Sequence, residues 1–103
     1  MSRALVFRRE VVGDLAAAII WYRNNKPGLE LAFQREFEAT LAAIEQNPLQ
    51  YQTVELGMRR VMLHGFPYAV MYTVSERQIL IVGCRHARRN PAEWKKRLDD
   101  PRR

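Results

Sequence analysis

The sequence predicts an α+β fold with the order β-α-α-β-β-β, in which a helical hairpin packs on a small antiparallel sheet and a short C-terminal helix follows. Residues 10–25 and 29–46 carry apolar residues at helical spacing, and residues 59–84 contain β-rich runs separated by tight turns. The chain has 103 residues, 48% of them hydrophobic, which suffices for one core but would leave two halves too small to be stable alone. We therefore expect a single domain over residues 1–103, with a tail from about residue 90.

The first strand is predicted over residues 3–8, a brief apolar run bounded by arginines. The apolar spacing then changes to steps of 3, 4 and 3, which is typical of an amphipathic helix; the residues at these steps are Val12, Leu15, Ile19 and Tyr22. Pro27 and Gly28 end this helix, because proline lacks a backbone donor and disfavours helix in the residue before it.

A second helix is predicted from about residue 29 to 46, with apolar residues in steps of 4, 4 and 3: Phe33, Phe37, Leu41 and Ile44. Asn47 and Pro48 stop it. Because only a short turn joins the two helices, they should pair antiparallel. Their shared apolar stripe needs a sheet to cover it.

The remaining residues supply this sheet. Residues 49–57 have mixed polarity and are predicted as a loop, and strands are predicted at 59–63, 68–74 and 78–83. The last two strands are almost continuously hydrophobic, which indicates central strands or cover on both faces. Asn90, Pro91 and Glu93 then supply an N-cap, a proline in the first turn and a capping glutamate for a short helix that holds Trp94.

Composition excludes several classes of protein. No segment approaches the roughly 20 apolar residues of a membrane span, and the N-terminus lacks the apolar core of a signal peptide, so we expect a soluble cytoplasmic protein. Cys84 is the single cysteine and leaves no internal disulfide. With His64 and His86 it makes too small a donor set for zinc. Ser2, Ser75 and the scattered glycines fit neither a hydrolase nor a phosphate-binding loop, so we expect no metal and no cofactor.

Charge is distributed unevenly along the chain. Residues 1–58 contain 6 basic and 7 acidic residues, whereas residues 59–103 contain 11 basic and 4 acidic residues, a net charge of +7. A basic half on a near-neutral half favours one face that meets a polyanion or an acidic protein surface. The alternative is a generally basic surface that keeps the protein in solution.

The densest group of cations lies in residues 85–97, beside a histidine and a tryptophan. Such a cluster can hold phosphates, stack on a base or bind an acidic protein groove. We assign target binding to Arg85, His86, Arg88, Arg89, Trp94 and Arg97. For Trp94 the alternative is that its ring packs the tail onto the body of the domain.

Motifs along nearly the whole chain, from about residue 3 to 97, form an ordered set: Asp14-Leu15, Trp21-Tyr22, Pro27-Gly28-Leu29, Phe33, Phe37, Ile44, Asn47-Pro48, Arg59-Arg60, Phe66-Pro67-Tyr68, Tyr72, Arg85-His86-Ala87-Arg88-Arg89-Asn90-Pro91 and Trp94. The most specific part is Phe-Pro-Tyr followed by His-x-x-Arg-x-Pro-x-x-Trp. This set resembles the RelE/ParE superfamily of bacterial toxins. Its members are the toxic halves of type II toxin–antitoxin operons, which include plasmid stabilisation systems.

The resemblance implies one of two mechanisms. ParE-like members inhibit DNA gyrase by binding and have no catalytic residues, whereas RelE-like members cleave mRNA in the ribosome. No tyrosine follows Tyr72, although a terminal tyrosine is often found in the ribonucleases, so the resemblance favours a ParE-like toxin whose target is DNA gyrase or a gyrase–DNA complex. The alternative is a RelE-like mRNA endonuclease on the ribosome, with the candidate catalytic residues His86, Arg59, Arg60 and Arg89.

The resemblance also implies a cognate antitoxin, a small protein that lays an amphipathic helix and an extended segment over exposed apolar surface. We place this surface on one side of the helical hairpin, with Leu15, Ile19 and Trp21 as the candidate contacts. Core packing is the alternative for each of them.

Overall fold

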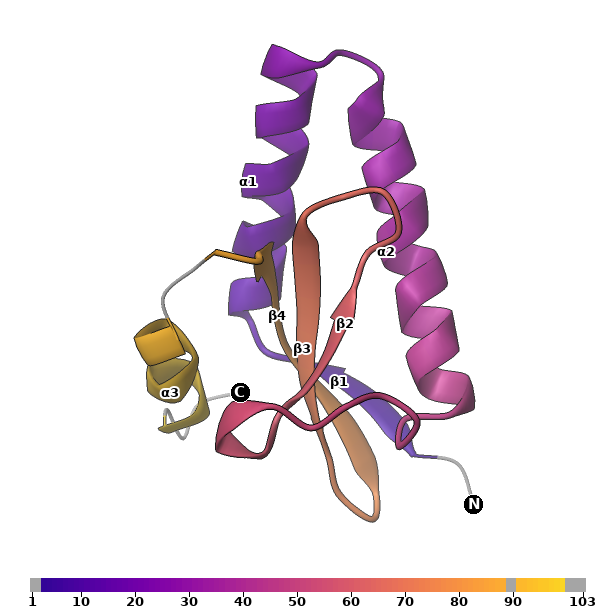
Figure 1. The fold of residues 1–103 in the computed structure, drawn as a ribbon, viewed down its shortest axis with the longest axis vertical. Coiled ribbons are helices and arrows are strands. Elements are labelled where there is room, and N and C mark those ends of the chain that lie inside the picture. The colour runs from indigo at the N-terminus through magenta and orange to yellow at the C-terminus, as the bar shows by residue number, and fades with distance from the viewer. Residues whose placement is uncertain (1–2, 89–90, 100–103) are drawn as a thin grey trace.

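The computed structural model describes residues 3–88 and 91–99, and for residues 91–93 it describes the backbone alone. Two long helices lie behind a four-stranded sheet, and a short helix lies on the other side (Figure 1). The elements are β1 (Ala4–Phe7), α1 (Glu10–Asn25), α2 (Leu29–Gln46), a 3-10 turn (Glu55–Gly57), β2 (Arg59–Met62), β3 (Tyr68–Val74), β4 (Gln78–His86) and α3 (Pro91–Asp99). The predicted order of elements is therefore confirmed.

The sheet has the strand order β1-β4-β3-β2. The pairs β2–β3 and β3–β4 are antiparallel, as the sequence predicts, whereas β1 joins β4 in parallel. Parallel pairing is possible here because the helical hairpin, rather than a tight turn, follows β1. β4 also continues past the predicted end at residue 83, since Arg85 and His86 pair with Ala69 and Tyr68 of β3. This extension brings the first two residues of the basic segment onto the sheet.

The main core lies between the two long helices and the sheet, and its centre is aromatic. Tyr22 of α1 stacks on Phe33 of α2 with ring centres 5.6 Å apart, and Phe33 meets Tyr68 of β3 edge-on at 5.1 Å. The predicted stripe of α2 packs here, whereas on α1 the buried residues differ in part from the predicted ones; the buried residues of the two helices are Val11, Ala18, Tyr22, Phe33, Phe37 and Ile44. The rings of Tyr22 and Phe33 therefore hold Tyr68 in place at the start of β3. Tyr68 in turn contacts His86 at the end of β4.

The opposite face of the sheet is covered by a second cluster of buried residues: Met58, Met71, Leu80, Val82 and Trp94. Trp94 belongs to α3, which lies beside β4 (Figure 1). Cover on both faces explains why β3 and β4 are almost continuously hydrophobic, as the sequence analysis proposed.

Candidate functional site

The free edge of β4 beyond β1 is closed by a buried ion pair. Pairing with β1 ends at Ile81, and from there the Asp14 carboxylate accepts the backbone N–H of Cys84 at 3.1 Å. Arg97 donates to both Asp14 oxygens, at 2.6 and 2.9 Å, and to the carbonyl of Val82 at 3.2 Å. Arg97, assigned to target binding from the sequence, is thus engaged inside the fold.

Trp94 has the same structural role. Its side chain is 6% exposed, and the Arg97 guanidinium lies 5.3 Å from the centre of its ring. The ring therefore packs α3 onto the sheet, which is the alternative that the sequence left open for this residue. Arg89, another assigned contact, lies outside the described residues.

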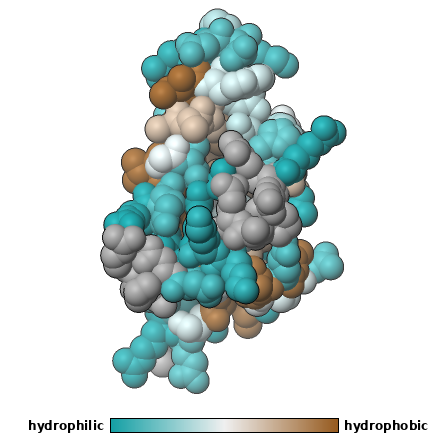
Figure 2. Space-filling view, turned by 90° about the vertical axis from the view of Figure 1, so that its left-hand side faces the viewer, coloured by the Kyte–Doolittle hydropathy of each residue, from teal (hydrophilic) through white to brown (hydrophobic). Residues whose placement is uncertain are grey.

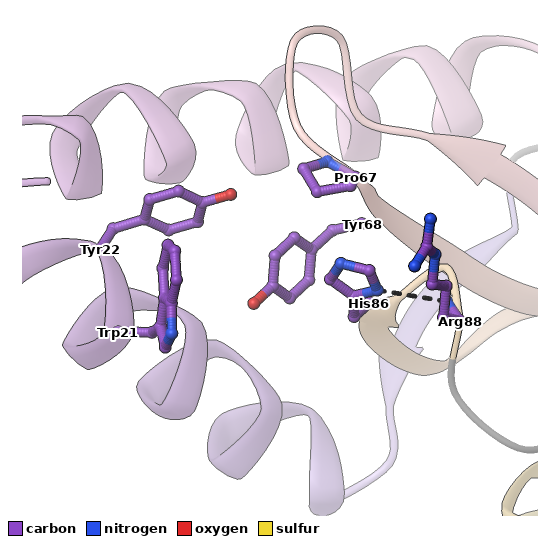
Figure 3. A pocket seen from close by; sticks show the side chains of 6 residues that line it. All are labelled: Trp21, Tyr22, Pro67, Tyr68, His86 and Arg88. Carbon is purple, nitrogen blue, oxygen red and sulfur yellow. Dashed lines mark hydrogen bonds between the residues drawn. The ribbon is translucent and has the colours of Figure 1, made fainter. Parts of the chain in front are cut away.

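An aromatic pocket opens between the C-terminal half of α1 and the ends of β3 and β4 (Figure 3). It has a volume of about 520 Å³ and is lined by Trp21, Tyr22, Pro67, Tyr68, His86 and Arg88, the six residues that we call the aromatic pocket. Burial, followed by the neighbouring Tyr68, raises the pKa of Tyr22, so the Tyr22 hydroxyl stays protonated at neutral pH. The structure therefore joins two sets that the sequence separated: Trp21, assigned to the antitoxin, and His86 with Arg88, assigned to the target.

A smaller hollow of about 170 Å³ lies on the α3 side of the sheet and shares His86 with this pocket; Arg60, Arg85, His86 and Glu55 are among the residues that line it. We call these four residues the cationic hollow. Arg85 Nε lies 4.0 Å from Asp14 Oδ1. Sequence reasoning missed Glu55, because it precedes a strand by only a few residues in a loop without any pattern.

The alternative catalytic set is only partly assembled. His86 and Arg60 share the cationic hollow, whereas Arg59 donates to the backbone carbonyls of Tyr51 and Leu49, at 2.6 and 3.3 Å, and so fixes the loop before β2. Cys84 offers no nucleophile, because burial, with a smaller effect of the Asp14 charge, raises the pKa of its thiol to about 12.

The outer side of α1 carries an exposed apolar strip. Val12 is 75% exposed and Ile20 52%, whereas Trp21, 49% exposed, points to the opposite side of the helix from Val12. The predicted contacts Leu15 and Ile19 are instead half-buried and line a shallow groove with Phe37 of α2. The sequence analysis placed Val12 in the buried stripe of this helix and so did not predict it on the surface. In a helix of only 16 residues, the apolar spacing does not determine which edge of the apolar stripe packs on the core.

Comparison with known proteins identifies the family. The family described as "ParE toxin of type II toxin-antitoxin system, parDE" matches residues 5–91. The chain belongs to this family. The solved structure "Chromosomal ParDE TA system from P. aeruginosa" aligns with a TM-score of 0.74 at 20% identity, covering 82% of this chain and 96% of that one. "The structure of YoeB dimer from Staphylococcus aureus" aligns with a TM-score of 0.54 at 15% identity, covering 82% and 97%. No curated protein matches the sequence.

This ParE-family toxin thus presents three surface features to a partner: the cationic hollow, the aromatic pocket beside it and the apolar strip of α1. Figure 2 shows the side on which α1 and α3 lie, where hydrophilic residues gather across the middle and hydrophobic ones form separate patches. Within residues 3–88 and 91–99, no cluster of three or more His, Cys, Asp or Glu side chains suits a metal ion. None of the helices in that part of the chain is long and apolar enough to cross a bilayer.

Proposed function

We propose that this toxin acts in the cytoplasm by binding DNA gyrase or a gyrase–DNA complex. The match to the ParE family over residues 5–91 carries the proposal, because the ParE-like branch is the one that the sequence resembles and that acts by binding. The arrangement of the cations supports it. Arg59 and Arg97 make hydrogen bonds within the fold. Arg60 and Arg88 are exposed, and they lie at neighbouring openings that can meet an acidic surface.

The test adds purified toxin to gyrase in a supercoiling assay. Turnover should stop, or cleaved DNA should accumulate, and an equimolar amount of the cognate antitoxin should prevent it. The same preparation should leave mRNA intact in a translating extract. Gyrase that is unaffected while mRNA is cut at codons would replace the binding mechanism with the enzymatic one, and growth that continues when expression is induced would mean that the chain is not toxic.

The second candidate is an mRNA endonuclease, favoured by one observation: Glu55 and His86 line the same hollow as Arg60 and Arg85. Cleavage beside a 2′-hydroxyl needs a general base, a general acid and cations for the phosphorane charge, and these residue types supply them. Under this mechanism His86→Gln and Glu55→Gln should each lower the cleavage rate by about 100-fold or more. Under the binding mechanism neither substitution alters mRNA in the extract.

For the antitoxin we propose an amphipathic helix that lies on the apolar strip of α1. Exposed Val12 and Ile20 lie two turns apart on one side of the helix, with Ala16 exposed between them. A contiguous apolar strip on so small a domain is typical of a protein-binding surface. Leu15 and Ile19 extend it towards α2, whereas Trp21, the third predicted contact, lies on the side of α1 that borders the aromatic pocket.

Replacing Val12 and Ile20 together by glutamate should reduce antitoxin affinity by at least about 100-fold, because two apolar contacts become buried charges. Leu31→Glu is the matched control, since Leu31 is 55% exposed on α2 and lies off the strip. Calorimetric titration of antitoxin peptide into each folded variant measures both. Equal affinities for the double variant and the unchanged toxin would remove this surface from the proposal.

A further inference from the structure

The proposed contacts to gyrase and to the antitoxin use only Arg88 and Trp21 of the aromatic pocket and leave the rest of its lining without a role. Three of its lining residues carry aromatic rings from the tyrosine and tryptophan side chains, and His86 and Arg88 add nitrogen donors at one end. Within the described residues, no acidic side chain lines it. Ring faces beside cationic donors suit a ligand with a flat ring and a negative charge.

The ring walls are held in place by the core. Trp21 packs edge-on against Tyr22 with ring centres 5.0 Å apart, yet keeps half of its surface exposed. Tyr68 is held between Phe33, at 5.1 Å, and His86, at 5.5 Å. Figure 3 shows the Trp21 and Tyr68 rings on two sides of the opening. The pocket therefore requires little ordering of side chains when a planar ligand enters.

The polar end is defined by one hydrogen bond. The backbone N–H of Arg88 donates to His86 Nδ1 at 3.2 Å, so the neutral imidazole carries its proton on Nε2 and can donate from there. The exposed Arg88 guanidinium adds further donors. Together they offer more donors than one carboxylate needs, and they match the several acceptor oxygens of a phosphate.

We propose that the aromatic pocket binds a nucleotide, with the base stacked on Trp21 and the phosphate held by Arg88 and His86. The volume of about 520 Å³ accommodates a base, a sugar and a phosphate. His86 also lines the cationic hollow, so the two openings meet at this residue. The ligand chemistry is the same for a free nucleotide and for a nucleotide within a strand.

Titration calorimetry of the full chain with adenosine 5′-monophosphate tests the proposal, with adenosine and inorganic phosphate as partial ligands. The nucleotide should bind in a saturable way, and each partial ligand should bind about tenfold more weakly or worse. A short single-stranded oligo(dA) that binds more tightly than the mononucleotide identifies a strand as the ligand, and equal affinity identifies the free nucleotide. The same sequence in a duplex should bind less well, because its bases are already stacked.

Two variants separate the ring from the cation. Trp21→Leu keeps the apolar surface but removes the ring, and it should weaken nucleotide binding by about tenfold. Arg88→Gln should weaken it similarly and flatten its dependence on salt. Arg77→Gln is the matched control, since it removes one charge from the exposed β3–β4 turn and should leave the affinity unchanged. Circular dichroism confirms that each variant is folded.

Three results would overturn the proposal: no saturable binding of the nucleotide, wild-type affinity in Trp21→Leu, or phosphate alone binding as tightly as the nucleotide. A short peptide with an acidic and an aromatic residue serves as the competing ligand, and if it binds while the nucleotide does not, the pocket belongs to a protein partner. None of these measurements involves gyrase or the antitoxin. Failure here is therefore separate from failure of the proposed function.

Discussion

Asp14 sits at 8% side-chain exposure and accepts three hydrogen bonds, one from the backbone of Cys84 and two from Arg97. It stands where β1 has ended and β4 would otherwise leave backbone groups without strand partners. One carboxylate on α1 thus joins a strand edge to a helix on the other face of the sheet. The largely buried guanidinium of Arg97 donates to both oxygens of this carboxylate.

We expect Asp14→Asn to lower the free energy of unfolding by about 3 kcal/mol, because it removes the charge of the carboxylate that pairs with Arg97 at low exposure. Urea unfolding followed by circular dichroism measures the loss. Glu38→Gln, which makes the same chemical change at an exposed position of α2, should alter stability by less than about 0.5 kcal/mol. If Asp14→Asn were as stable as this control, the ion pair would contribute nothing to the fold.

Buried acids, chiefly Cys84 and Tyr72, make the free energy of unfolding depend on pH in the alkaline range. Burial is the main cause that raises the pKa of Cys84 from 9.0 to about 12 and that of Tyr72 from 10.0 to about 12, and the Tyr72 hydroxyl donates to the carbonyl of Pro48 at 2.6 Å. Between pH 9 and 12 the unfolded chain releases protons that the folded chain keeps. The folded state therefore binds more protons there, and the free energy of unfolding must fall as pH rises.

Urea unfolding at a series of pH values should give a level free energy of unfolding between pH 7 and 9 and a steady decline from pH 9 to 12. Cys84→Ala should remove the part that begins near pH 9. Tyr72→Phe should reduce the part that begins near pH 10, to which Tyr22 also contributes because burial raises its pKa. A decline of the same size and onset in Cys84→Ala would show that the thiol is not the group responsible.

At the scale of elements, local pattern predicted the helices well. Pro27-Gly28 and Asn47-Pro48 stop the helices, because proline disfavours helical backbone in the residue before it. α1 and α2 have the bounds that the sequence predicts. The parallel pairing of β1 could not be predicted, because nothing in a four-residue strand records its direction relative to β4. The site was harder still. Arg97 and Asp14 are 83 positions apart, and only the fold shows that one neutralises the other.

α3 is held on the sheet through the one position of β4 that has no side chain. A Cβ added at Gly83 would lie 2.7 Å from Trp94 Cζ3 and 2.7 Å from Asp14 Oδ2, and closer still to Arg97. Such distances are too short for ordinary contacts, so Gly83→Ala should displace α3 and expose Trp94. The glycine is required here for close approach rather than for backbone conformation.

Trp94 fluorescence in a Trp21→Phe background measures this displacement. Gly83→Ala should shift the emission of Trp94 to longer wavelength and lower the free energy of unfolding by about 2 kcal/mol, in the range of overpacked cores. Gly13→Ala is the control: nothing lies within 4 Å of its added Cβ, and alanine favours the helix, so stability should rise by about 0.5 to 1 kcal/mol. An unshifted Trp94 spectrum in Gly83→Ala would mean that α3 stays in place and that the β4 backbone absorbs the added methyl group.

At the scale of the whole molecule, the basic and the near-neutral halves of the chain form different secondary-structure elements. The basic half forms β2, β3, β4 and α3, and the near-neutral half forms β1 and the helical hairpin. The exposed residues Arg60 and Arg88 lie at the cationic hollow and the aromatic pocket, and the exposed residues Lys95 and Lys96 lie on α3. Long-range attraction depends on all of these charges, whereas docking depends on those that touch the partner.

These two effects can be separated by salt. Under the binding mechanism, the association rate of the toxin with immobilised gyrase should fall as salt rises from low to physiological concentration, because the Debye length shortens to about 8 Å. Replacing Arg60 and Arg88 together by glutamine should lower the rate by about tenfold at low salt, flatten the salt dependence and speed dissociation. Replacing Lys95 and Lys96 by glutamine removes the same net charge, so the association rate should fall by a smaller factor and dissociation should be unchanged. Equal effects of the two double variants on both rates would mean that net charge alone drives the encounter, and that the end of the sheet is not the docking surface.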